Sequence, residues 1–252
     1  MKPFIILFLL VLNLFVTAQS INTSLTYTYH LPTKTSNKTP LLIMLHGYGS
    51  NETDLFEMHK TFDERYAVFS LRAPISIPQS GFCWFPIEIK NDSTLVYDYK
   101  KVLESKKLIL SFISNACKTF NLDSSNVVLF GFSQGAILST DIAITTPNKI
   151  KGIIALSGML LKETEAQIKN TKQWQNINQV KIRFAHGYSD NVINIKQAQK
   201  IEKLIAEKNL TNSKMKYYKM GHNICGEELN DIKSWLTTMV KSSSEKTSIN
   251  KK

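Results

Sequence analysis

The stretch Val127-Val128-Leu129-Phe130-Gly131-Phe132-Ser133-Gln134-Gly135 decides the fold class. Its apolar first half is typical of a strand buried on both faces of a parallel sheet, and a helix-like segment over residues 136–145 follows it directly. A serine on such a tight strand-to-helix turn has strained backbone angles, and glycines two positions before and after it let the turn close without clashes. The hydroxyl is then raised above the sheet beside a helix N-terminus, which favours developing negative charge. Ser133 is therefore a candidate nucleophile.

Short apolar runs alternate with longer amphipathic segments along the rest of the chain, which is the pattern of βα repeats around a parallel sheet. The predicted strands are residues 25–29, 41–45, 66–71, 126–130, 152–157, 181–185 and 215–218. Apolar residues at helical spacing predict covering helices over residues 97–120, 195–206 and 227–240. We expect a single α/β domain over residues 19–240, with a mostly parallel central sheet and helices on both faces.

Residues 1–18 have the layout of a secretory signal peptide. A lysine precedes apolar runs over residues 4–12 and 14–16, and small residues suited to a signal peptidase end at Ala18. The runs are shorter than the roughly 20 apolar residues that a membrane-spanning helix needs. We expect cleavage after Ala18 and a secreted or periplasmic mature protein without stable membrane insertion.

The composition narrows the classes of partner. The formal net charge is +11 at pH 7, but the lysines are scattered and no nucleic-acid motif accompanies them. We interpret them as solvated surface and expect no nucleic-acid partner.

The tail, residues 241–252, has almost no apolar content, which predicts disorder. The three cysteines are too few for a disulfide framework, although a bridge between Cys83 and Cys225, both in predicted loops, is conceivable.

Two further side chains complete a candidate triad, in the order acid then histidine that this kind of turn requires. Asp190 follows the predicted strand 181–185, and His222 follows the predicted strand 215–218. A carboxylate there can hold the imidazole in one tautomer and stabilise its protonated form. The imidazole can then act as a base towards Ser133 and as an acid towards a leaving group.

A glycine-rich turn, Leu45-His46-Gly47-Tyr48-Gly49, closes the second predicted strand. Such a turn can aim a backbone N–H at a substrate carbonyl, and we assign the backbone N–H groups of Tyr48 and Gln134 to an oxyanion hole. An ordinary βα turn is the alternative. His46 and His186 each lie beside a glycine at a strand end, and we expect both to be structural.

These motifs together resemble a known family. Leu45-His46-Gly47-Tyr48-Gly49, Gly131-Phe132-Ser133-Gln134-Gly135, His186-Gly187-Tyr188-Ser189-Asp190 and Gly221-His222 resemble the phospholipase/carboxylesterase family, which includes acyl-protein thioesterases and small bacterial carboxylesterases. Gly81-Phe82-Cys83-Trp84-Phe85 and Leu156-Ser157-Gly158 match further family segments. The chain departs from the family at Ala136, where a second glycine is usual, and at Asn191, where proline is usual. The resemblance implies an α/β-hydrolase fold and a Ser-Asp-His hydrolase without metal or cofactor.

The expected activity is that of a secreted serine carboxylesterase that forms an acyl-enzyme from a small-molecule or carbohydrate-linked acyl ester. Trp84, Phe85, Met159 and Leu160 are candidates for an acyl pocket, although such side chains are more often plain core. A thioesterase or lysophospholipase is an alternative activity, and the expected export argues against removal of lipids from proteins inside cells. A binding protein that keeps the fold without catalysis is the alternative from another class. The sequence does not indicate an oligomeric state.

Overall fold

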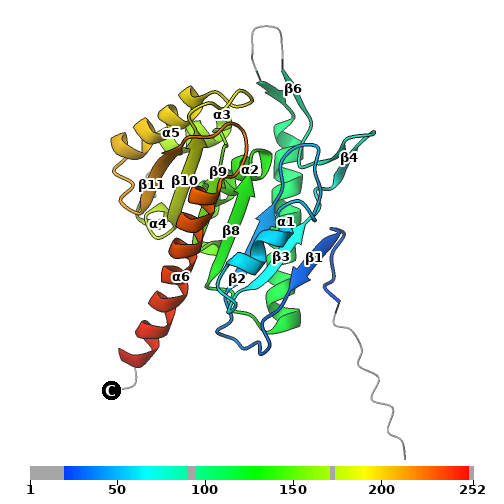
Figure 1. Ribbon diagram of the computed structural model, residues 1–252, viewed down its shortest axis with the longest axis vertical. Helices are drawn as coiled ribbons and strands as arrows, with labels where there is room; N and C mark the ends of the chain where they lie inside the picture. The colour runs from blue at the N-terminus through cyan, green and yellow to red at the C-terminus, as the bar shows by residue number, and fades with distance from the viewer. Residues whose placement is uncertain (1–19, 90–94, 171–173, 250–252) are drawn as a thin grey trace, which may run out of the picture.

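A central sheet organises the computed structural model, which describes residues 20–89, 95–170 and 174–249 (Figure 1). The strands are β1 (Tyr27–His30), β2 (Leu41–Leu45), β3 (Ala67–Leu71), β8 (Val127–Phe132), β9 (Gly152–Leu156), β10 (Lys181–Gly187) and β11 (Ser213–Tyr218). They form one seven-stranded sheet in the order β1-β3-β2-β8-β9-β10-β11. β1 pairs antiparallel with β3, and the other pairs are parallel. Each strand predicted from the sequence is present, with ends shifted by a few residues.

Apolar side chains on both faces of the sheet explain why helices cover both. In β2, Leu41, Ile43 and Leu45 face one buried cluster, while Leu42 and Met44 face the other. Successive side chains of a strand point to opposite faces, so a continuous apolar run needs cover on each side. Helices α1 (Tyr99–Phe120), α2 (Gln134–Thr145) and α5 (Ile195–Glu207) cover the first face, and α6 (Gly226–Ile249) with the 3-10 turn η1 (Phe56–Thr61) covers the second. The predicted α/β-hydrolase fold class is confirmed.

Several short elements lie in connections where the sequence predicted none. β4 (Ile75–Ile77) pairs with β5 (Gly81–Cys83), and β6 (Ile87–Ile89) pairs with β7 (Leu95–Tyr97), all between β3 and α1. The turn η2 (Pro147–Lys149) precedes β9, and α3 (Lys162–Asn170) and α4 (Trp174–Ile177) lie between β9 and β10. All of these except α3 have only three or four residues, which is too short to show a hydrophobic period in the sequence. Helix α3 has nine residues, but Ile168 is its one buried apolar residue, so it shows no apolar period either.

Predictions from the sequence also concern the two ends of the chain and its cysteines. The predicted signal peptide, residues 1–18, lies outside the described residues. Helix α6 runs on to Ile249, so residues 241–249 are helical where the sequence predicted a disordered tail, and residues 250–252 of that tail lie outside the described residues. A helix closes its backbone hydrogen bonds within its own segment, so it can extend without apolar burial. Cys83 and Cys225 are free thiols, so the conceivable bridge is not formed. Among the described residues, no helix combines the length and apolar content needed to cross a membrane.

Candidate active site

Ser133 is the single residue between the end of β8 and the start of α2. Its φ of 51° lies in the left-handed region, which is uncommon for a residue with a side chain and marks a strained turn. The flanking glycines make this turn possible. A Cβ on Gly135 would lie 2.0 Å from the carbonyl oxygen of Leu45, and one on Gly131 would lie 2.3 Å from that of Gly135. The turn therefore requires both glycines.

Ser133, His222 and Asp190 come together at the carboxyl ends of the parallel strands. The His222 Nε2 lies 2.9 Å from the Ser133 Oγ, and the His222 Nδ1 lies 2.8 Å from the Asp190 Oδ2. In the tautomer that donates from Nδ1 to the carboxylate, Nε2 is free to accept the serine proton. The three side chains thus form one chain of hydrogen bonds.

The Asp190 carboxylate is buried but well supplied with donors. Its Oδ1 accepts hydrogen bonds from the backbone N–H groups of Val192 and Ile193, at 2.9 and 2.8 Å. Burial by itself raises the pKa of Asp190, but the hydrogen bonds from His222 and the two backbone groups outweigh burial and lower it. His186 supports this loop, since its Nε2 lies 2.8 Å from the Ile193 carbonyl oxygen. Asp190 is therefore a carboxylate at neutral pH.

The predicted oxyanion hole has its two halves on neighbouring segments. A Cβ built on Gly47 would lie 3.3 Å from the Ser133 Cβ, so the turn after β2 passes directly beside the serine. Tyr48 follows in that turn. Gln134 is the first residue of α2, where a backbone N–H has no partner within the helix. In the described part of the chain, no hydrogen bond occupies either N–H group.

His46 has the structural role expected of it. Its ring is fully buried, its Nε2 accepts from the Ala73 backbone N–H at 3.0 Å, and its Nδ1 lies 2.7 Å from the Gly47 carbonyl oxygen. Burial lowers the pKa of His46, against the opposing effect of the bond to Gly47. The neutral ring therefore ties the turn after β2 to the end of β3.

The candidate pocket residues lie in the core. Trp84 and Phe85 are 0% exposed, which differs from the predicted pocket, because segments remote in sequence enclose both rings. Leu160 is also buried, and Met159 packs partly buried against the same core. Neither Trp84 nor Phe85 can touch a substrate in this structure.

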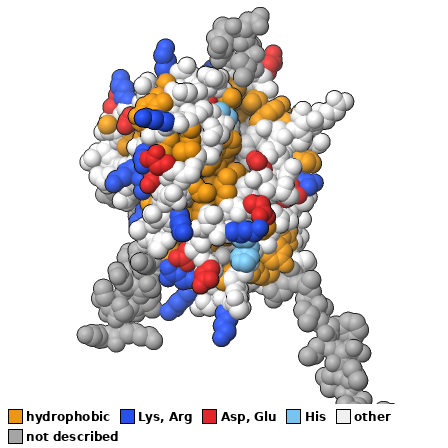
Figure 2. Space-filling view, in the orientation of Figure 1, with side chains coloured by type: hydrophobic (Ala, Val, Ile, Leu, Met, Phe, Trp, Pro, Cys, Tyr) orange, Lys and Arg blue, Asp and Glu red, His pale blue; other side chains and the backbone are white. Residues whose placement is uncertain are grey.

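Exposed apolar side chains instead lie on the loops that carry the site. Tyr48, Tyr188 and Val192 are 43%, 58% and 64% exposed. Tyr48, whose backbone N–H the sequence assigns to the predicted oxyanion hole, lies in the turn after β2. Sequence reasoning missed Tyr188 and Val192, although both lie close to Asp190 in sequence, which was the signal that could have identified them. On the face that Figure 2 shows, Lys and Arg side chains are scattered among Asp and Glu around a central apolar area, in keeping with a solvated surface.

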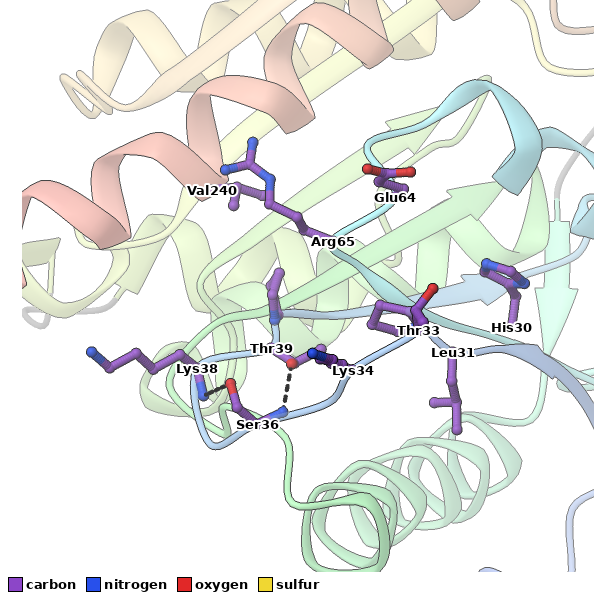
Figure 3. Close-up of a pocket in the computed structure, with 12 residues that line it drawn as sticks. His30, Leu31, Thr33, Lys34, Ser36, Lys38, Thr39, Glu64, Arg65 and Val240 are labelled. Carbon is purple, nitrogen blue, oxygen red and sulfur yellow. Dashed lines mark hydrogen bonds between the residues drawn. The ribbon is translucent and has the colours of Figure 1, made fainter.

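A separate cavity of about 760 Å³ lies at the amino ends of β2 and β3, whereas Ser133 lies at the carboxyl ends of the parallel strands (Figure 3). Thr39 and Pro40, which precede β2, and Arg65, which precedes β3, help to line it. The Arg65 guanidinium is already hydrogen-bonded to both carboxylate oxygens of Asp63. Because Ser133 follows the carboxyl end of β8, this cavity is not part of the candidate active site.

The fold and the site define a class of protein. A serine on a strained strand-to-helix turn of a mostly parallel sheet, hydrogen-bonded to a histidine and through it to a carboxylate, is the arrangement of α/β-hydrolase serine hydrolases. Within this class, the chain belongs to the phospholipase/carboxylesterase family, whose model matches residues 30–240.

Individual relatives agree with this assignment. The chain is 25% identical to acyl-protein thioesterase 1 of Mycosarcoma maydis, over 80% of this chain and 92% of that one. It is 26% identical to acyl-protein thioesterase 1 of Candida albicans, over 83% and 96% of the two chains. The crystal structure of the Bacillus cereus carboxylesterase has the same fold, with a TM-score of 0.71, 21% identity and coverage of 86% and 96%. The protein is thus a hydrolase of the carboxylesterase and acyl-protein thioesterase type, a serine hydrolase acting on ester bonds.

Proposed function

We propose that this protein is a serine carboxylesterase in which Ser133, His222 and Asp190 form the catalytic triad. The observation that carries the proposal is the unbroken chain of hydrogen bonds from the Asp190 Oδ2 through His222 to the Ser133 Oγ. Family membership supports the reaction class, and this geometry supports the choice of residues.

In the acylation step, the Ser133 Oγ attacks the ester carbonyl carbon while His222 Nε2 accepts the serine proton. The carbonyl oxygen becomes an oxyanion, which the backbone N–H groups of Tyr48 and Gln134 stabilise. The His222 Nε2–H then protonates the leaving alkoxide, and the alcohol departs from the acyl-enzyme. Asp190 stays ionised and stabilises the imidazolium.

In deacylation, His222 accepts a proton from water as the water oxygen attacks the acyl carbon. The second tetrahedral intermediate collapses, Ser133 leaves with the proton held by His222, and the carboxylic acid is released. The same residues thus serve both halves of the reaction.

The proposed substrates are small-molecule or carbohydrate-linked acyl esters. Thioesters are the second candidate, because the named relatives are acyl-protein thioesterases and a thiolate can leave the same tetrahedral intermediate. Comparing kcat/KM for matched oxygen and thiol esters of one acyl group separates the two.

Hydrolysis of p-nitrophenyl acetate, butyrate, octanoate and palmitate tests the proposal. Purified protein is assayed beside Ser133→Ala and His222→Ala, and each variant should lose at least about 10³-fold in kcat. A fluorophosphonate should label the wild type at Ser133 and not label Ser133→Ala. If the wild type hydrolyses no ester or thioester and resists the label, the chain is instead a binding protein that keeps the fold.

We also propose that the mature protein is exported. The layout of residues 1–18 supports this proposal. N-terminal sequencing of protein recovered outside the cytoplasm should begin at Gln19. A protein recovered only from the cytoplasm with Met1 in place would contradict export.

A further inference from the structure

The segment of residues 81–85, which we call the oxyanion clamp, touches both halves of the proposed oxyanion hole. On the first half, the Gly49 N–H donates to the Phe82 carbonyl at 2.9 Å, and the Phe82 N–H donates to the Ser50 carbonyl at 2.9 Å. The Trp84 indole N–H donates to the His46 carbonyl, also at 2.9 Å. These bonds bracket Tyr48 on both sides.

On the second half, the clamp is held by the side chain of Gln134. Its Oε1 accepts from the Trp84 backbone N–H at 2.8 Å, and its Nε2 donates to the Phe85 carbonyl at 2.7 Å. The residue whose backbone N–H faces the oxyanion is therefore fixed through its own carboxamide. The clamp is tied to α1 as well, since the Ser105 hydroxyl donates to the Trp84 carbonyl.

Burial strengthens the hydrogen bonds of Trp84 and Gln134 and restricts the movement of the groups that they join. Trp84 is 0% exposed and Gln134 is 2% exposed, so no water competes for the bonds, and a buried polar group left unpaired is costly. The aromatic ring also lies against the neutral His46 ring, with centroids 5.5 Å apart. The clamp therefore couples two segments that come from different parts of the chain.

We propose that Trp84 and the Gln134 carboxamide are positioning residues that set the spacing between the Tyr48 and Gln134 N–H groups. The inference rests on the proposed esterase function. An oxyanion donor acts only when it lies about 2.7–3.1 Å from the charged oxygen, and a misplacement of about 1 Å can cost about 10²-fold in rate. Neither side chain touches substrate, so each acts through the backbone donors.

Trp84→Phe tests the role of the indole, because phenylalanine keeps an aromatic ring and loses the N–H donor. We expect kcat to fall about 10- to 100-fold, with KM changed less than about 2-fold, since the lost stabilisation belongs to the transition state. A trifluoromethyl ketone adds to the serine and creates an oxyanion, so its inhibition constant should rise by about the same factor as kcat falls.

Tyr66→Phe is the matched structural control. The Tyr66 hydroxyl donates to the Leu236 carbonyl at 3.2 Å within the other core cluster, so this variant also loses one buried hydrogen bond to a carbonyl. It should lower Tm and leave kcat unchanged. If Trp84→Phe behaves like Tyr66→Phe, or raises KM without lowering kcat, the positioning role is refuted.

Two further measurements keep the test decisive. Should Trp84→Phe fail to fold, a benzothiophene analogue in place of the Trp84 indole removes the N–H and keeps a fused aromatic ring of nearly the same shape, and the same loss of kcat is expected. Ser133→Ala is assayed in parallel. An inactive wild type refutes the proposed function, whereas an active wild type with an equally active Trp84 variant refutes only the clamp.

Discussion

Asp190 combines burial with a full set of hydrogen-bond donors, and this combination sets its charge. Backbone N–H groups hold one carboxylate oxygen, and the His222 Nδ1 holds the other. Because these bonds lower the pKa of Asp190, the side chain stays ionised at neutral pH. The carboxylate selects the tautomer that leaves the His222 Nε2 facing Ser133.

Asp190→Asn should lower kcat about 10³-fold or more while leaving the fold intact. The amide can present an N–H to the His222 Nδ1, which turns the ring into the tautomer that carries its proton on Nε2 and cannot accept one from Ser133. Steady-state kinetics beside a circular dichroism spectrum measures both effects. Asp123→Asn, which changes a carboxylate that accepts from Ser125 in a turn before β8, is the control and should retain wild-type kcat. A loss below 10-fold for Asp190→Asn would contradict the triad.

The strand-to-helix turn between β8 and α2 is an element with almost no tolerance for added atoms. Helix α2 approaches β2 so closely that Gly135 lies against the backbone at Leu45 and His46. Gln134 precedes this glycine, so close packing and the proposed oxyanion hole depend on the same turn.

Gly135→Ala should lower the free energy of unfolding by about 3 kcal/mol, because its Cβ would lie 2.0 Å from a backbone oxygen that cannot rotate away. Urea denaturation measures the change. Gly226→Ala is the matched control at the start of α6, where an added Cβ meets nothing within 4 Å, and its stability should stay within about 0.5 kcal/mol of the wild type. Equal urea midpoints for Gly135→Ala and Gly226→Ala would contradict this prediction and show that the turn can relax around an added Cβ.

The stability of the whole molecule should depend on a buried carboxyl group outside the triad. Glu228, in the first turn of α6, is 0% exposed, and within the described residues neither of its oxygens has a hydrogen-bond partner of good geometry. Burial raises the pKa of Glu228 to about 8, partly offset by the nearby Cys225 backbone N–H. The folded protein therefore holds a proton that the unfolded chain releases above its ordinary pKa of 4.5.

The pKa of Glu228 is higher in the folded protein than in the unfolded chain. The protonated side chain therefore makes its full contribution to the free energy of unfolding below about pH 4.5, and this contribution is lost as the pH rises towards 8. Glu228→Gln cannot ionise, so it should be close to the wild type near pH 5 and exceed it by about 4 kcal/mol at pH 8.5. Unfolding free energies across this range measure the difference. Glu227→Gln, at an exposed neighbour, should follow the wild-type curve. Parallel curves for the wild type and Glu228→Gln would contradict the prediction.

Local patterns in the sequence determined the strands of the central sheet, the turn at Ser133 and the order of Asp190 and His222. Each depends on a few neighbouring residues: an apolar run buried on both faces, two glycines at fixed spacing, or a loop that directly follows a strand. Parallel strands then bring their carboxyl ends to one edge, so residues in different loops meet without further information.

Only the tertiary structure decided which side chains are enclosed and what they hold. From the sequence alone, Trp84 and Phe85 fit a substrate pocket and the protein core equally well. Contacts with the Gln134 side chain and the His46 carbonyl place them in the core. The unpaired burial of Glu228 and the two short hairpins before α1 were equally unpredictable. The physical reason is that burial and hydrogen bonding at these positions depend on segments remote in sequence, and no local period records which segments will meet.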